Sequence, residues 1–172
     1  MIMRPGQQLL LPANPFFIWS SLLLAMSLNM LPLGRAAWTP DLLALVLVFW
    51  SVHQPLRVGI GAAFLFGIAM DVHQAALLGQ HALAYTALSY FAITIHRRLL
   101  WFTVPSQAVQ VLPLFAAAHA IELAIRMLAG GVFPGVPVLL APVIESLLWP
   151  LVSVLLLAPQ RRAPDPDENR PL

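Results

Sequence analysis

The stretch QAVQVLPLFAAAHAIELAIRMLA (residues 107–129) decides the fold, because it is long and apolar enough to cross a bilayer yet carries ionisable side chains in its second half. About 20 apolar residues in a helix span the hydrocarbon core of a membrane. The rest of the chain has the same character, since 60% of its 172 residues are hydrophobic and 9% are charged. A soluble domain carries about 25% charged residues. The sequence therefore predicts an all-α polytopic membrane protein.

Five further apolar runs flank this stretch, and the predicted spans are 16–33, 38–52, 57–72, 82–95, 107–129 and 138–158. Five spans is the alternative, through a different division of region 57–95. We expect 16–33 to remain as an uncleaved first helix, because it is longer than the apolar part of a signal peptide and more spans follow. Residues 1–158 thus form a single transmembrane domain. The polar, Pro-rich tail 159–172 is expected to be disordered.

The distribution of arginine predicts the orientation. The chain has nine arginines and no lysine. With six spans, Arg35 and Arg126 fall on one side of the membrane, and all the others fall on the opposite side: Arg4, Arg57, Arg97, Arg98, Arg161, Arg162 and Arg170. Loops rich in basic residues stay in the cytoplasm. Both termini are therefore predicted to be cytoplasmic.

Several classes of function are not expected. The absence of cysteine excludes disulfides, thiolate metal sites and a Cys nucleophile. The sequence contains none of the hydrolase, zinc-protease or phosphate-loop motifs, so we expect no enzyme and no cofactor. His73 and His81 lie near Asp71, but their spacing matches no established metal-ligand pattern. The scattered arginines form no stripe that would track nucleic acid, and no inverted repeat favours a secondary transporter.

A polar cluster is predicted in the outer half of the membrane. His119, Glu122 and Arg126 are spaced to share one face of a helix, and Glu122 is expected to pair with Arg126, with Glu145 joining or competing. The predicted cluster comprises Asp41, Asp71, His81, His119, Glu122, Arg126 and Glu145. Two interpretations stay open: an outward-facing pocket or partner-docking site, and a structural ion pair that fixes helix packing.

Other patterns concern helix packing. Gly59, Ala63 and Gly67 form a ridge of small residues that lets another helix approach closely, either an internal neighbour or another subunit. Pro113 and Pro150 are predicted to kink or break their helices. The triplet 39–41 (Thr-Pro-Asp) is interpreted as a helix start with Thr39 as the N-cap. Tryptophans are expected to anchor the interfaces, at Trp19, Trp38, Trp50 and Trp101.

The order of several short motifs resembles a known family. Pro40-Asp41 opens the second span, GIAMDV (67–72) closes the third, LGQHALAY (78–85) follows, and Trp149-Pro150 lies in the last. Over nearly its whole length the chain resembles the MreD family of bacterial rod shape-determining proteins. The segment 67–85 is the most specific part. One departure is the turn HQAA (73–76), where the family often has small turn-forming residues.

The resemblance implies a multi-pass protein of the bacterial inner membrane that acts as a non-enzymatic scaffold or regulator of rod shape and lateral peptidoglycan synthesis. The implied partners are MreC, the MreB filament, the peptidoglycan polymerase and transpeptidase, and membrane lipid. It also implies a fold similar to the substrate-binding S-components of vitamin transporters. The alternative is a small-molecule-binding membrane protein or transporter subunit, with the polar cluster as an outward-facing pocket.

Overall fold

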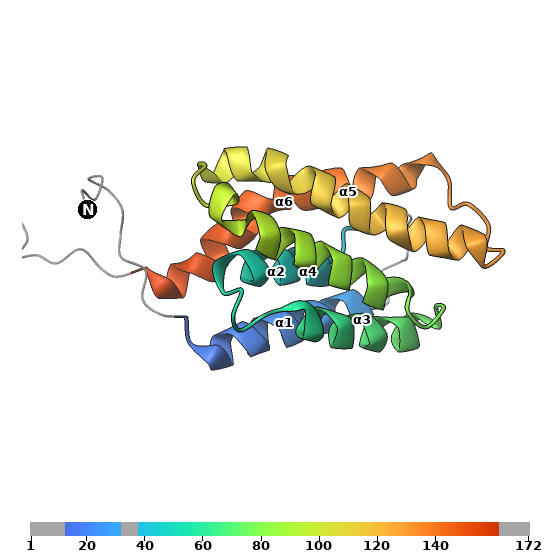
Figure 1. Ribbon diagram of the computed structural model, residues 1–172, viewed down its shortest axis with the longest axis horizontal. Coiled ribbons are helices and arrows are strands. Elements are labelled where there is room, and N and C mark those ends of the chain that lie inside the picture. The colour runs from blue at the N-terminus through green and yellow to red at the C-terminus, as the bar shows by residue number, and fades with distance from the viewer. Residues whose placement is uncertain (1–12, 32–37, 162–172) are drawn as a thin grey trace, which may run out of the picture.

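The computed structural model describes residues 13–31 and 38–161, and six α-helices lie within these ranges (Figure 1). They are α1 (Pro15–Met30), α2 (Leu42–His53), α3 (Ile60–Gln74), α4 (Gln80–Leu99), α5 (Val104–Leu128) and α6 (Leu140–Leu157). Two short 3₁₀ helices, η1 (Val136–Leu139) and η2 (Ala158–Gln160), flank α6. The all-α class and the six predicted helices are confirmed, and the region 57–95 contains two of them.

The helices lie side by side, with their connections at the two ends of the bundle, and α2 forms the centre (Figure 1). All ten residues of α2 from Leu43 to Val52 are buried, against α1, α4 and α6. Aromatic rings fill the middle of the core: the ring of Phe49 lies 5.0 Å from Trp50 and 6.2 Å from Trp149 between centroids. Because neighbouring helices bury α2 on every side, its sequence is a nearly continuous apolar run without a polar face.

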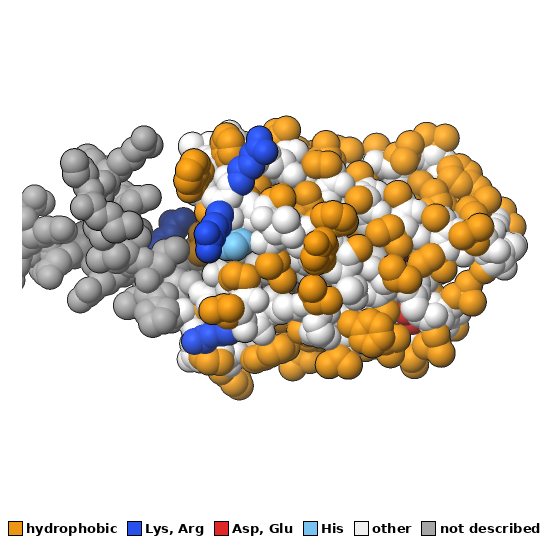
Figure 2. Space-filling model, viewed as in Figure 1, with side chains coloured by type: hydrophobic (Ala, Val, Ile, Leu, Met, Phe, Trp, Pro, Cys, Tyr) orange, Lys and Arg blue, Asp and Glu red, His pale blue; other side chains and the backbone are white. Residues whose placement is uncertain are grey.

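The exterior of the bundle is apolar. Large hydrophobic side chains are exposed along the helices, among them Leu24, Leu65, Val109 and Leu147, and Figure 2 shows them spread over the whole visible face. Both α5 and the helical segment Val136–Gln160 are long and apolar enough to cross a membrane, whereas α1, α2 and α3 are apolar but shorter. The described helices thus present to their surroundings the surface that a lipid environment requires.

Basic side chains gather at one end of the bundle. Arg57, Arg97, Arg98 and Arg161 are exposed beside the α2–α3 and α4–α5 connections and after α6. Figure 2 shows basic side chains only at this end of the visible face, which we call the arginine end. Arg126, in the last turn of α5, lies toward the opposite end. The predicted asymmetry of arginine therefore holds for all five described arginines.

Two predictions about helix boundaries are wrong. The helix α2 begins at Leu42, and its N-cap is Asp41 rather than Thr39, because the carboxylate of Asp41 accepts the N–H of Ala44 at 2.9 Å and also lies at the positive end of the helix dipole. Residues 159 and 160 of the predicted tail belong to η2, and Gln160 is buried, with its side-chain amide donating to the Leu156 carbonyl at 3.0 Å. The remainder of the tail, 162–172, lies outside the described residues.

Pro113 and Pro150 do not break their helices, because each lies inside a helix that continues on both sides, α5 and α6. Pro113 is exposed, whereas Val111 and Phe115 beside it are fully buried. The packing of these neighbours holds the helix across the missing backbone hydrogen bond.

The ridge of small residues is correct at two of its three positions. Ala63 and Gly67 are buried, and a Cβ built on Gly67 would lie 2.3 Å from the Cα of Ala82, so α4 crosses α3 at this point. Gly59 precedes α3 as its N-cap in extended backbone and meets no helix. The ridge therefore serves an internal neighbour.

One tryptophan was assigned to the wrong environment. Trp19, Trp38 and Trp101 are exposed as expected, but Trp50 is fully buried in α2. Its indole N–H donates to the hydroxyl of Ser21 at 2.8 Å, which satisfies the polar atom without water. Trp50 is a core residue that ties α2 to α1.

Candidate functional site

Asp71 joins the end of α3 to the start of α4. Its carboxylate accepts the backbone N–H groups of Gly79 (2.8 Å), His81 (2.7 Å) and Ala82 (3.3 Å), and a hydrogen bond links it to the His81 imidazole (2.8 Å). Asp71 is fully buried. Since the first N–H groups of a helix lack partners within it, Asp71 acts as the cap of α4 from a neighbouring helix.

The turn between these two helices departs from ordinary backbone geometry. Ala75 ends α3 with φ +50°, in the left-handed region that favours glycine. The N–H of Ala76 then donates to the backbone carbonyl of Asp71 at 3.0 Å. The departure noted in the sequence of residues 73–76 thus places an alanine in a glycine-like conformation.

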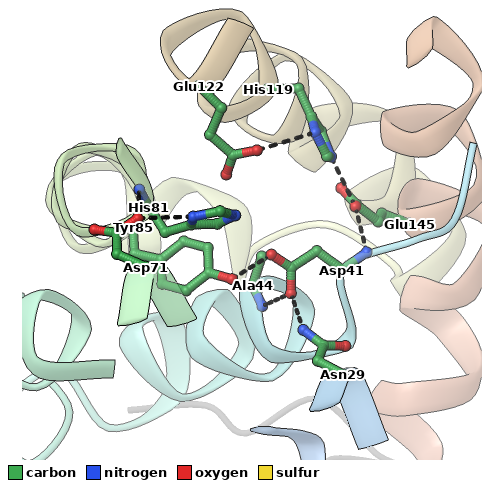
Figure 3. Close-up of polar contacts among 9 residues, drawn as sticks. All are labelled: Asn29, Asp41, Ala44, Asp71, His81, Tyr85, His119, Glu122 and Glu145. Atoms are coloured by element: carbon green, nitrogen blue, oxygen red, sulfur yellow. Dashed lines mark hydrogen bonds and ion pairs between the residues drawn. The ribbon is translucent and has the colours of Figure 1, made fainter. Parts of the chain in front are cut away.

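Asp41 is the hub of a second group of contacts (Figure 3). One carboxylate oxygen accepts the side-chain amide of Asn29 at 2.6 Å and the N–H of Ala44, and the other accepts the hydroxyl of Tyr85. The amide oxygen of Asn29 in turn accepts the N–H of Leu42 at 3.1 Å. Asp41 therefore holds α1, α2 and α4 together at one end of the bundle.

His119 connects α5 to α6. Its Nε2 lies 2.8 Å from Oε1 of Glu145, and its Nδ1 lies 3.7 Å from Oε2 of Glu122. Glu145 is fully buried, and its Oε1 also accepts the backbone N–H of Asp41 at 2.8 Å. A chain of contacts thus runs from Glu122 through His119 and Glu145 to Asp41 (Figure 3).

The expected ion pair between Glu122 and Arg126 is wrong. Among the described residues, the ion-pair partner of Glu122 is His119, and Arg126 has no carboxylate within 4.0 Å. The imidazole is closer in the fold because His119 stands between the two glutamates, whereas Arg126 lies one turn further along and is exposed. Glu145 joins the cluster as predicted, but through His119.

These side chains surround a cavity of about 840 Å³ at the end of the bundle opposite the arginine end, which we call the cavity end. Five of the seven predicted cluster residues line it: Asp41, His81, His119, Glu122 and Arg126. Asp71 and Glu145 are buried and do not line it. Apolar side chains complete the lining, including Leu28, Leu31, Leu77 and Val138.

Two lining or supporting residues were not among the predicted site residues. Asn29 lines the cavity and binds Asp41. Its polar side chain near the end of an apolar span was the feature of the sequence that could have identified it. Tyr85 is fully buried behind Asp41, with its ring 5.9 Å from that of His81. The signal for Tyr85 was its spacing of four residues from His81, which places both side chains on one helix face.

The arrangement suits binding or support rather than covalent chemistry. Within the described residues, no group of three or more His, Asp and Glu side chains is placed to hold a metal ion. The hydroxyl of Tyr85 is committed to Asp41, and the imidazoles of His81 and His119 are each committed to a buried carboxylate. Charged, polar and apolar side chains line the cavity together, a mixture that can orient a ligand as well as enclose it.

Comparison with known proteins places the chain in a family. Residues 12–158 match the family of the rod shape-determining protein MreD. The rod shape-determining protein MreD of Haemophilus influenzae is 27% identical over 135 residues, which cover 76% of this chain and 81% of that protein. No solved structure matches the chain, so the expected similarity to transporter S-components stays a prediction.

The family match covers all six helices and every residue of the predicted polar cluster. Its members are membrane proteins and shape-determining proteins, and they are not known as enzymes. The prediction of a non-enzymatic protein is thereby confirmed at the level of the family. The chain belongs to the MreD family of rod shape-determining proteins.

Proposed function

We propose that this protein is a non-enzymatic scaffold or regulator of rod shape and lateral peptidoglycan synthesis, acting in the bacterial inner membrane with MreC, MreB and the peptidoglycan polymerase and transpeptidase. The single observation that carries the proposal is the family match over residues 12–158. The described residues support it physically, because their connections are short and no separate soluble domain is present among them. A partner therefore has to be bound through helix faces, through turns or through parts of the chain outside the described residues.

All six helices span the membrane in this proposal, with both termini cytoplasmic. The short helix α2 is compatible with it: 12 residues extend only about 18 Å against a hydrocarbon core of about 30 Å. Its neighbours enclose it, and backbone at membrane depth is tolerated where protein rather than lipid surrounds it. The four described arginines at the arginine end favour the cytoplasmic side for that end.

The partner in direct contact is proposed to be MreC, through the turns of the cavity end, which then face the periplasm. The α5–α6 connection carries exposed apolar side chains, among them Val132 and Phe133, in a position where no packing within the described residues requires them. Exposed apolar side chains on a turn favour a protein contact.

The test is capture of MreC by the tagged protein in mild detergent. Val132→Asp should lower the captured amount about tenfold, since a carboxylate at an apolar contact loses on the order of 1.4 kcal/mol or more. Leu56→Asp, on the exposed α2–α3 connection at the arginine end, is the matched control and should capture MreC as the wild type does. The scaffold proposal would be contradicted if the wild-type protein captured no MreC although its thermal unfolding showed that it was folded.

The cavity favours a second candidate function, a small-molecule-binding membrane protein or transporter subunit. Its volume of about 840 Å³ lies within the range of about 300–1,000 Å³ typical of ligand sites. Thermal stabilisation by a specific compound, measured on the purified protein, distinguishes this candidate from the scaffold alone.

A further inference from the structure

Two opposite charges on one wall of the cavity do not neutralise each other. Glu122 and Arg126 both line the cavity and lie four residues apart on α5, a spacing at which a Glu–Arg pair ordinarily forms on a helix surface. Within the described residues they make no ion pair with each other. Among the described residues Glu122 has only the long contact with His119, and the exposed Arg126 has no carboxylate within 4.0 Å, so both side chains are available to a group that enters the cavity.

The other cavity carboxylate already accepts three hydrogen bonds. Asp41 receives the amide of Asn29, the N–H of Ala44 and the hydroxyl of Tyr85. Glu122 differs, because its contact among the described residues is the ion pair with His119 at 3.7 Å, longer than a hydrogen bond. Its side chain is 17% exposed. Glu122 is therefore the cavity carboxylate with more acceptor positions left for a cation.

The backbone holds Arg126 at the rim of the cavity. Gly131 donates its N–H to the Arg126 carbonyl at 2.9 Å, and Gly130, with φ +81°, donates to Met127 at 3.1 Å. This is the glycine-terminated end typical of a helix. A Cβ on Gly131 would lie 2.8 Å from Cγ of Arg126, so this glycine packs directly against the arginine stem. The helix end thus fixes the backbone of Arg126 and the start of its side chain, and the planar N–H groups of a guanidinium suit a phosphate or carboxylate.

We propose that the cavity binds a zwitterion, whose ammonium group contacts Glu122 and whose phosphate or carboxylate contacts Arg126. This inference rests on the second candidate function, that of a binding cavity. A zwitterion with the two charges a few bonds apart contacts both side chains at once, whereas a simple cation or anion contacts only one of them. Leu28, Leu31 and Leu77 on the lining provide an apolar border. The same chemistry is offered by a free amino compound such as phosphoethanolamine and by the head group of phosphatidylethanolamine.

The first experiment measures binding to the purified full-length protein in detergent, by calorimetry and by the shift in thermal unfolding. Phosphoethanolamine is compared with ethanolamine, which has only the cation, and with inorganic phosphate, which has only the anion. Phosphoethanolamine should bind at least about tenfold more tightly than either fragment, as expected when one further ion pair is made. Equal binding of a fragment would leave a binding cavity but overturn the zwitterion. The absence of binding by all three, together with the lipid result below, would overturn both.

Variants assign the two charges. Glu122→Gln should reduce phosphoethanolamine binding to the level of phosphate alone, and Arg126→Gln should reduce it to the level of ethanolamine alone. Arg97→Gln, an exposed arginine at the arginine end, is the matched control and should leave binding unchanged. Arg126 is itself exposed, so its variant stays informative where Glu122→Gln fails to fold. Unchanged binding in Arg126→Gln overturns the proposal.

Nanodiscs distinguish the two sources of the zwitterion. If the ligand is the lipid head group, discs of phosphatidylethanolamine should raise the unfolding temperature above that in phosphatidylglycerol discs, and Arg126→Gln should abolish the difference. If the ligand is a free compound, phosphoethanolamine should stabilise the protein equally in both kinds of disc. No stabilisation by either source refutes the zwitterion, while MreC capture by the same preparation shows separately whether the scaffold function stands.

Discussion

At the scale of single residues, Asp71 illustrates how a buried charge can be structural. Its carboxylate receives three backbone N–H groups and one imidazole, so the charge is compensated by donors at the start of α4. A buried carboxylate without such donors would be strongly unfavourable. Asp71 therefore belongs to the fold rather than to the wall of the cavity, although sequence placed it with the cavity residues.

Asp71→Asn should lower the free energy of unfolding by about 2–3 kcal/mol. The substituted amide keeps one acceptor oxygen but points an NH₂ group at backbone donors, so about two charge-assisted hydrogen bonds are lost. The measurement is thermal or denaturant unfolding of the purified protein. His73→Gln, on an exposed side chain in the same helix end, should stay within about 0.5 kcal/mol of the wild type. A stable Asp71→Asn protein that fails to support rod shape would instead point to a direct role in function.

At the scale of helices, α3 and α4 approach each other closely where they cross at Gly67. Gly67→Ala would place a methyl group 2.3 Å from the Cα of Ala82, against backbone that cannot move without separating the helices. We expect a loss of about 1–3 kcal/mol or more in stability and a lower protein level. The readout is the unfolding temperature together with the amount of protein in the membrane.

Gly61 in the same helix provides the control for this substitution. A Cβ at Gly61 meets nothing within 4 Å, so Gly61→Ala should be neutral or should raise stability by up to about 1 kcal/mol through helix propensity. If Gly61→Ala lowers stability as much as Gly67→Ala does, the loss at Gly67 comes from the change within the helix backbone and not from the contact with α4.

The helices were predictable from the sequence because long apolar runs separated by prolines and polar turns leave few alternatives. What was not predictable depends on neighbours in space. The sequence spacing on α5 favoured a pair between Glu122 and Arg126, but the imidazole of His119 lies between α5 and α6 and takes Glu122 instead. The position of Trp50 in the sequence suggested an interfacial anchor. In the fold, however, the residues of α2 from Leu43 to Val52 are all buried, and Trp50 is one of them. Both errors depend on packing between helices: the contact with Glu145 on α6 places the His119 imidazole beside Glu122 on its own helix, and the neighbours of α2 bury Trp50.

At the scale of the whole molecule, the arginine end and the cavity end are separated by the apolar body of the bundle (Figure 2). The proposed orientation assigns the connections α2–α3 and α4–α5 to the cytoplasm, and α3–α4 and α5–α6 to the periplasm. The chain contains no cysteine, so single-cysteine variants carry no background reactivity. Four highly exposed positions sample the four connections: Leu56, Leu78, Trp101 and Val132.

A membrane-impermeant maleimide applied to intact spheroplasts should label Leu78→Cys and Val132→Cys. Leu56→Cys and Trp101→Cys should be labelled only after permeabilisation, because the basic residues that flank them keep those connections in the cytoplasm. The reverse pattern would invert the molecule and place the cavity in the cytoplasm, beyond the reach of a periplasmic partner domain. Labelling of Leu56→Cys and Leu78→Cys from the same side would mean that α3 does not cross the membrane. Its 15 residues would then lie within the protein or at the interface, and the six-span topology would fail.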